Sequence, residues 1–181
     1  MKSAFIGTTI LVVTVCLIGC SKPSPEEYLA KATAAVDSSK FTLAIQAYED
    51  LIKDHPASLL VEEAMFKIAS IRNDNLHDFP GAIEAYKRYT EKYPQGKQGP
   101  IALFLTAYLY NNELHDLANA KIAYEKFLAT YPNHEMASSA DFELKHLGKT
   151  PEELLPGIQQ STQQTAAQTS SPKPIQKSKK K

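Results

Sequence analysis

The segment AIEAYKRYTEKYP, residues 82–94, decides the fold because the chain contains its pattern three times. The pattern recurs as AIQAYEDLIKDHP at 44–56 and as AKIAYEKFLATYP at 120–132, so the copies lie 38 residues apart. Each copy begins with Ala, continues with a second Ala, an aromatic Tyr and a large apolar residue, and ends in Pro. An internal period of this kind is typical of a protein built from stacked structural repeats.

The spacing within each copy is that of a helix. In the first copy, Ala44, Tyr48 and Leu51 stand at i, i+4 and i+7, which places them on one helical face. The closing Pro ends the helix because it has no N–H group and disfavours a helical residue before it. Another stretch with helical apolar spacing precedes each copy, and one more follows the last. The sequence therefore predicts three helical hairpins and a closing helix, at about 25–57, 60–95, 98–133 and 134–147.

Capping residues occur at several of the expected helix starts. Ser24 with Glu27, and Thr150 with Glu153, match the capping box, in which each side chain bonds the other residue's backbone N–H. The second box predicts a short helix over 151–155. The single residues expected to cap helices are Asp78, Asp116 and Asn133, and those expected to face inward on the closing helix are Phe142 and Leu144.

The repeated pattern resembles the tetratricopeptide repeat over about residues 25–134, because all three copies match the second-helix signature of that family. The small first-helix residue of the family is matched by Ala69 and Ala107, whereas Arg72 stands where Tyr is usual. The family period is 34 residues, and the four extra residues here fit into the turns. The resemblance implies an all-α, right-handed superhelical stack of three hairpins plus the closing helix, within a domain over 25–156. It also implies a concave groove, lined by the first helices, that binds peptides.

Residues 1–20 have the features of an export signal. Lys2 precedes an apolar run over 5–18, which is shorter than the ~20 residues of a membrane-spanning helix and suits a signal peptide. The run ends in Leu-Ile-Gly-Cys at 17–20, which resembles the lipobox of bacterial lipoproteins. The resemblance implies removal of residues 1–19, lipidation of Cys20, and a short linker over 20–24. The alternative is an ordinary cleaved signal peptide, or a short membrane helix, in which Cys20 is incidental.

A lipobox followed by helical repeats resembles the outer-membrane tetratricopeptide lipoproteins, such as those of the β-barrel assembly machinery and of the Tol–Pal system. The resemblance implies an adaptor that binds protein partners in the bacterial cell envelope, anchored through Cys20. Ser21, where Asp would retain a lipoprotein at the inner membrane, implies the outer membrane facing the periplasm. Two alternatives stay open: a pilotin-like lipoprotein for a secretin or pilus system, and a cell-wall-binding protein or envelope enzyme.

The two ends of the chain differ in charge from the middle. Residues 157–181 are rich in Gln, Ser, Thr and Lys, and this composition predicts a disordered tail. Its five lysines fit lipid headgroups, an anionic polymer or an acidic partner, or are simply solvated. Between residues 20 and 157 the chain holds 14 basic and 20 acidic residues. An acidic body is unlike a nucleic-acid-binding domain, which concentrates Lys and Arg on the fold.

Patterns typical of catalysis are missing. The sequence has no Gly-rich phosphate loop, Ser nucleophile elbow or His-Glu-x-x-His motif, so we expect no catalytic residue, cofactor or small-molecule substrate. The pairs at 77–78 and 115–116, both His-Asp, suggest a metal site, but they share one repeat position and a turn-and-cap role explains both. The two cysteines, Cys16 and Cys20, both belong to the export signal, which excludes thiol chemistry in the mature chain.

The aromatic residues of the first helices have two interpretations. They share one phase of the repeat, so in one helical frame they line the peptide-binding groove together with polar residues. In the other frame the phenyl rings are core and the two Asn residues merely end helices. A shift of one residue exchanges the two interpretations. The candidate groove residues are Phe66, Ser70, Asn73, Phe104, Tyr108 and Asn111.

Overall fold

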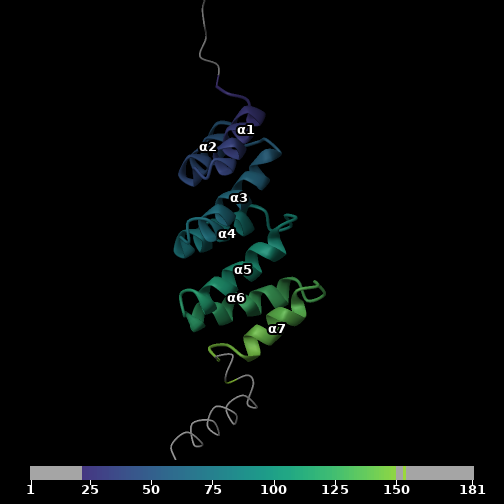
Figure 1. The fold of residues 1–181 in the computed structure, drawn as a ribbon. Coiled ribbons are helices and arrows are strands. Elements are labelled where there is room, and N and C mark those ends of the chain that lie inside the picture. The colour runs from purple at the N-terminus through teal and green to yellow at the C-terminus, as the bar shows by residue number, and fades with distance from the viewer. Residues whose placement is uncertain (1–21, 150–152, 154–181) are drawn as a thin grey trace, which may run out of the picture.

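Seven helices follow one another along the part of the chain that the computed structural model describes, residues 22–149 and Glu153 (Figure 1). They are α1 (Pro25–Asp37), α2 (Phe41–Asp54), α3 (Leu60–Asp74), α4 (Phe79–Lys92), α5 (Gly99–Asn112), α6 (Leu117–Thr130) and α7 (Ala137–Lys145). This part of the chain contains no strand, and none of its helices is long and apolar enough to cross a bilayer. The predictions that lie outside the described residues concern the signal peptide 1–19, Cys20, Thr150, the helix over 151–155 apart from Glu153, and the tail 157–181.

The helices form a stack in chain order, from α1 at one end to α7 at the other (Figure 1). Helices α1–α2, α3–α4 and α5–α6 are the three predicted hairpins, and each hairpin packs on the next. Contacts thus run mainly between sequence neighbours, as in solenoid proteins, where one hairpin cannot bury its apolar face alone. The predicted all-α stack of three hairpins and a closing helix is confirmed.

The repeated residues of the second helices form the core. Ala44, Ala82 and Ala120 are fully buried, because a small side chain at this position lets the neighbouring helix approach closely. The repeated large residues that are buried beside them are Tyr48, Leu51, Tyr86, Tyr89, Tyr124 and Phe127. Helix α5 separates two core clusters: one of its faces packs against the preceding helices and another against α6 and α7.

The predicted caps are confirmed where the structure describes them. The side chains of Asp78 and Asp116 each accept a hydrogen bond at 3.1 Å from the backbone N–H three residues later, and Ser24 forms the full capping box with Glu27. His77 and His115, which precede the two Asp caps, both have φ of 51°. This left-handed conformation is strained for most side chains, but His adopts it more readily. The repeated His-Asp pair is therefore explained by the backbone of a turn.

Two predictions for the closing helix are wrong. Asn133 does not cap it: residues 131–134 form a turn, and α7 begins only at Ala137, later than predicted. Phe142 does not face inward, since 51% of its surface is exposed. It shares the phase of Phe104, but no second helix follows α7 among residues 22–149 to cover the ring.

The sequence of α7 is suited to this exposed position. Asp141 and Lys145 occupy the positions held in α5 by the buried Leu103 and Ala107, and they form an ion pair at 2.6 Å. Leu144 is partly buried against α5 and α6, as predicted. Helix α7 therefore closes the stack with one apolar side and one charged outer side, as terminal repeats require.

Candidate protein-binding groove

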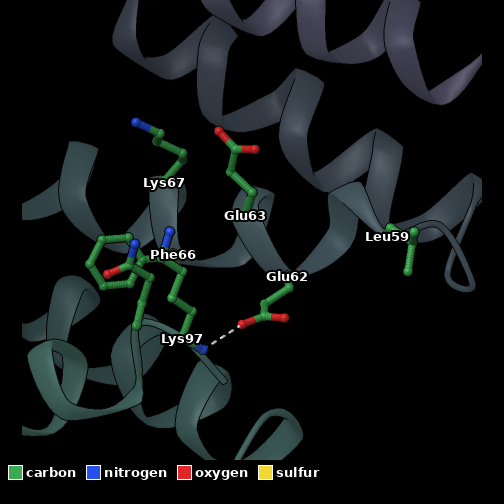
Figure 2. Close-up of a pocket in the computed structure, with 7 residues that line it drawn as sticks. Leu59, Glu62, Glu63, Phe66, Lys67 and Lys97 are labelled. Carbon is green, nitrogen blue, oxygen red and sulfur yellow. Dashed lines mark hydrogen bonds between the residues drawn. The ribbon is translucent and has the colours of Figure 1, made fainter. Parts of the chain in front are cut away.

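Two adjoining hollows lie along the first helices of the hairpins. One, of about 440 Å³, is bounded by α3 and by the segment before α5, and Figure 2 shows its lining. The other, of about 460 Å³, lies between α1 and α3. Glu63 and Lys67 line both, so the two hollows adjoin, and together we call them the first-helix groove.

The groove residues of α3 are mostly charged. Reading along the helix, the groove row consists of Glu63, Lys67, Ser70 and Asp74. Lys97 adds a further positive charge beyond the end of α4 (Figure 2). Two acids that flank a lysine at helical spacing can orient a polar or charged peptide, because complementary charges determine register more than affinity.

The same row on α5 carries no charge. The equivalent positions, 38 residues later, are Ile101, Leu105, Tyr108 and Asn112, and no charged residue occurs anywhere between 98 and 112. Ile101 and Tyr108 expose 37% and 39% of their surface. Exposed apolar and aromatic side chains beside a polar rim are typical of a protein-binding surface. Tyr108, one of the groove residues predicted from the sequence, is exposed in this row, but neither hollow is lined by it or by the other residues of the α5 row.

The rings of Phe66 and Phe104 lie mainly against their own hairpins. Phe66 stands edge-on to Tyr89, with ring centroids 5.7 Å apart, and Phe104 stands edge-on to Phe127 at 5.9 Å. Both rings are partly buried, and Phe66 still borders the first hollow (Figure 2). They therefore hold the two helices of a hairpin together and leave only part of their surface to the groove.

The two predicted Asn residues lie beside the groove row. The amide of Asn73 donates to the carboxylate of Asp74 at 2.6 Å, and Asp74, not Asn73, lines the hollow. Asn111 borders a separate hollow of about 310 Å³ near the turn after α5, together with His115. Asn73 therefore precedes Asp74, the last residue of the α3 row, by one position, and Asn111 precedes Asn112 of the α5 row in the same way.

A buried hydroxyl links the second hairpin to the wall of the first hollow. Tyr89 donates to a carboxylate oxygen of Glu62 at 2.8 Å, and its oxygen accepts the backbone N–H of Gln98 at 3.0 Å. The N–H of Lys97 donates to the same oxygen of Glu62 at 3.0 Å (Figure 2). Burial, with the hydrogen bond to Glu62, raises the pKa of Tyr89 to about 12. The phenol therefore keeps its proton at neutral pH and holds the segment before α5 in place.

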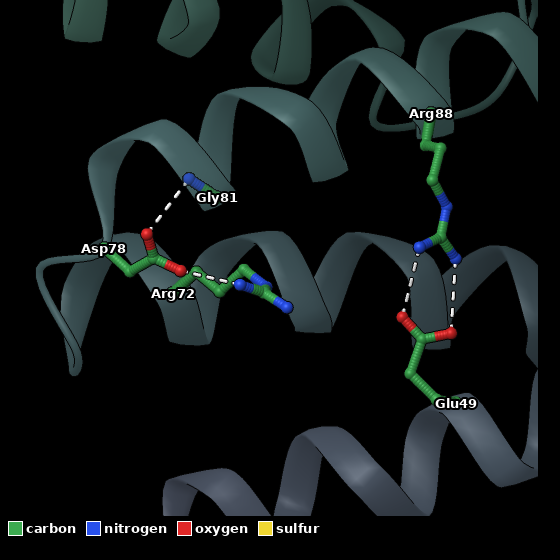
Figure 3. A network of polar contacts seen from close by, with 5 residues as sticks. All are labelled: Glu49, Arg72, Asp78, Gly81 and Arg88. Carbon is green, nitrogen blue, oxygen red and sulfur yellow. Dashed lines mark hydrogen bonds and ion pairs between the residues drawn. The ribbon is translucent and has the colours of Figure 1, made fainter.

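Two ion pairs connect helices elsewhere in the stack (Figure 3). Arg72, which departs from the usual Tyr, donates to Asp78 at 2.6 Å and so ties α3 to the cap of α4. Arg88 of α4 bonds both carboxylate oxygens of Glu49 of α2, at 3.1 and 3.3 Å. Both pairs are partly exposed, so each stabilises the stack by no more than about 1 kcal/mol. Neither pair provides a reactive group.

No group of three His, Cys, Asp or Glu side chains in residues 22–149 is arranged to hold a metal ion. The features that the structure does bring together are a groove, a charged row and an apolar row. These define an α-helical repeat protein with a surface suited to other polypeptides. Models of the tetratricopeptide repeat match residues 29–97 and 101–134, together more than half of the chain. The chain belongs to the tetratricopeptide repeat family, whose members typically act as non-enzymatic scaffolds for other proteins. No curated protein matches it significantly.

Proposed function

We propose that this protein is a membrane-anchored scaffold of the bacterial cell envelope. Lipid on Cys20 holds it at a membrane, and the first-helix groove binds a segment of a partner protein. The lipobox at 17–20 supports the anchor. The exposed uncharged row of α5, next to the charged row of α3, is the observation that carries the binding function. Assembly of outer-membrane proteins and maintenance of the envelope are the processes that the resemblance to envelope lipoproteins favours.

The two rows predict the chemistry of the bound segment. Ile101, Leu105 and Tyr108 favour apolar side chains, and covering each partly exposed residue contributes about 1 kcal/mol, less than the value for full burial. Glu63, Lys67 and the other polar groups of α3 favour a neighbouring stretch with charged or amide side chains. A segment that is apolar at one end and polar at the other therefore fits the groove in one orientation.

Crosslinking in living cells tests the groove. A photoreactive amino acid replaces Tyr108 in the exposed row of α5, and in a matched control it replaces Ile122, which is 62% exposed on α6. We expect the probe at 108 to give a defined adduct, identified by mass spectrometry, that the probe at 122 does not give. Identical adducts from both positions, or none from position 108 under conditions that label the membrane fraction, exclude the groove as the binding site.

Metabolic labelling tests the anchor separately. Radiolabelled palmitate should enter the wild-type protein and the Cys16→Ala variant, because Cys16 lies inside the predicted signal peptide. The Cys20→Ala variant should take up no label and leave the outer-membrane fraction. If Cys20→Ala is labelled as strongly as Cys16→Ala, Cys20 is not the lipidation site.

A further inference from the structure

The first described residues are fastened to the first hairpin. The carbonyl oxygen of Pro23 accepts a hydrogen bond from Nε2 of His55 at 2.7 Å. Asp54 receives two more bonds, from the ammonium of Lys22 at 2.8 Å and from the hydroxyl of Tyr28 at 2.7 Å. We call these three contacts the N-terminal clamp: those of Lys22 and Pro23 join the segment before α1 to the end of α2, and that of Tyr28 joins α1 itself to the same place. The segment therefore does not act as a free linker.

The clamp lies very close to the proposed lipidation site. Cys20 precedes Pro23 by three residues, and three extended residues span at most about 11 Å. That is about one helix diameter. A lipidated Cys20 lies in the membrane interface, because its acyl chains fill the hydrocarbon layer. Pro23, whose carbonyl is hydrogen-bonded to the ring of His55, then lies within about 11 Å of the lipidated residue, and the end of α2 lies directly behind it.

The turn after α2 exposes an apolar side chain to this layer. Leu59 is 96% exposed, and its turn starts directly at the clamp, where the N–H of Ser58 donates to the carbonyl of His55 at 2.9 Å. The equivalent residues of the next two repeats are Lys97 and Glu135, so the apolar residue belongs to the first turn and not to the repeat pattern. Lys53, exposed nearby, has Glu91 as its equivalent.

The charges at the clamp also suit a lipid surface. The carboxylate of Asp54 would be repelled by anionic headgroups, but its pairing with Lys22 neutralises it. Lys53 remains as an exposed cation on the same end of α2. An exposed apolar side chain in the turn, with a cation on the preceding helix end, suits the headgroup and acyl boundary of a bilayer.

We infer that the turn from His55 to Leu59 lies against the bilayer that holds the lipid of Cys20, with the Leu59 side chain in the headgroup layer. This inference rests on the proposed lipidation. It makes the first hairpin the membrane-facing end of the stack. Because α7 lies at the opposite end of the stack (Figure 1), helices α3 and α4 separate α5 from the membrane-facing hairpin, and the apolar row of α5 stays open to partners.

Site-directed fluorescence tests this contact in the lipidated full-length protein. The mature chain beginning at Cys20 has no other thiol, so Leu59→Cys and the matched control Glu135→Cys, at the equivalent position of the third repeat, each provide a single labelling site. Each variant is labelled with an environment-sensitive dye and reconstituted into phosphatidylethanolamine–phosphatidylglycerol vesicles that contain a spin-labelled lipid. We expect a blue shift and severalfold stronger quenching at position 59 than at position 135. Equal quenching at both positions, or none at position 59, overturns the inference.

Two further measurements separate the possible failures. Mass spectrometry of the same sample detects the lipid on Cys20; if the lipid is missing, the proposed anchor fails before membrane contact is tested. The double substitution Asp54→Ala and His55→Ala, added to Leu59→Cys, removes the clamp while circular dichroism checks that the helices are retained. Quenching at position 59 should then fall toward that at position 135. Undiminished quenching would show that the clamp does not position the turn.

Discussion

The hydroxyl groups of Tyr89 and Tyr124 should affect stability in opposite directions, although both rings are fully buried. The Tyr89 hydroxyl donates to Glu62 and accepts from Gln98, so all its polar capacity is used. The hydroxyl of Tyr124 is buried without a hydrogen-bond partner among the residues that the structure describes. Tyr89→Phe removes a hydroxyl that is hydrogen-bonded, and Tyr124→Phe removes one that is not, within residues 22–149. Because both substitutions delete the same atom, they are a matched pair.

The magnitudes follow from what each substitution leaves behind. Tyr89→Phe leaves the N–H of Gln98 and one bond of the Glu62 carboxylate unmade, and a bond to a charged group contributes about 1.5–3 kcal/mol. Tyr124→Phe removes a hydroxyl whose desolvation nothing offsets, so we expect no loss and a gain of up to about 1 kcal/mol. Burial also raises the pKa of the Tyr124 phenol, which is consistent with an unfavourable site for the phenolate.

Urea denaturation of the chain from Ser21 onward, followed by circular dichroism, measures both effects. We expect the midpoint to fall for Tyr89→Phe and to stay constant or rise for Tyr124→Phe. In thermal unfolding, 1 kcal/mol corresponds to a shift of roughly 4 °C for a domain of this size. Equal losses in both variants would refute the reasoning, because the cost would then come from the rings' packing and not from their hydrogen bonds.

Three further predictions concern turns and caps. A Cβ added at Gly96 would lie 2.4 Å from the buried Tyr89 hydroxyl. Gly96→Ala should therefore lower the thermal midpoint, and it should weaken the binding of any partner that is crosslinked from position 108. Asp78→Ala should cost more than the roughly 1 kcal/mol of a lost cap, because it also breaks the pair with Arg72. Asp116→Ala, measured by the same urea titration, should cost less, because besides the cap it breaks only an exposed hydrogen bond from the Asn119 amide. Hydrogen bonds from Asn119 hold the pKa of Asp116 below its usual range, so the stability that the charge contributes is present at neutral pH and is lost as the pH falls below about 4. The difference in stability between wild type and Asp116→Asn should therefore disappear in acid, and a constant difference from pH 7 to pH 3 would contradict this cause.

The hairpins could be predicted because their determinants are local and repeated. A small Ala at a helix crossing, a Pro after the last turn and an Asp at the first turn act through backbone geometry, which does not depend on distant parts of the chain. The closing helix was predicted less well because the repeat was extended beyond its last complete hairpin. Phe142 has the phase of Phe104, but the helix that covers Phe104 has no counterpart after α7 in residues 22–149. The sequence does indicate this difference, because Asp141 and Lys145 occupy the positions that Leu103 and Ala107 have in α5.

The groove was harder to locate because neighbouring residues of a helix point about 100° apart. An error of one position is enough to place Asn73 in the groove instead of Asp74. On α5 the apolar periodicity does not indicate which face is exposed, because apolar residues occur all around the helix. Such a helix is stable only where its neighbours cover it. Helices α4 and α6 cover most of it, and this packing cannot be read from the sequence of α5 alone. Ile101 and Tyr108 are what remains uncovered, and for this reason the row is the surface on which a partner has most to gain.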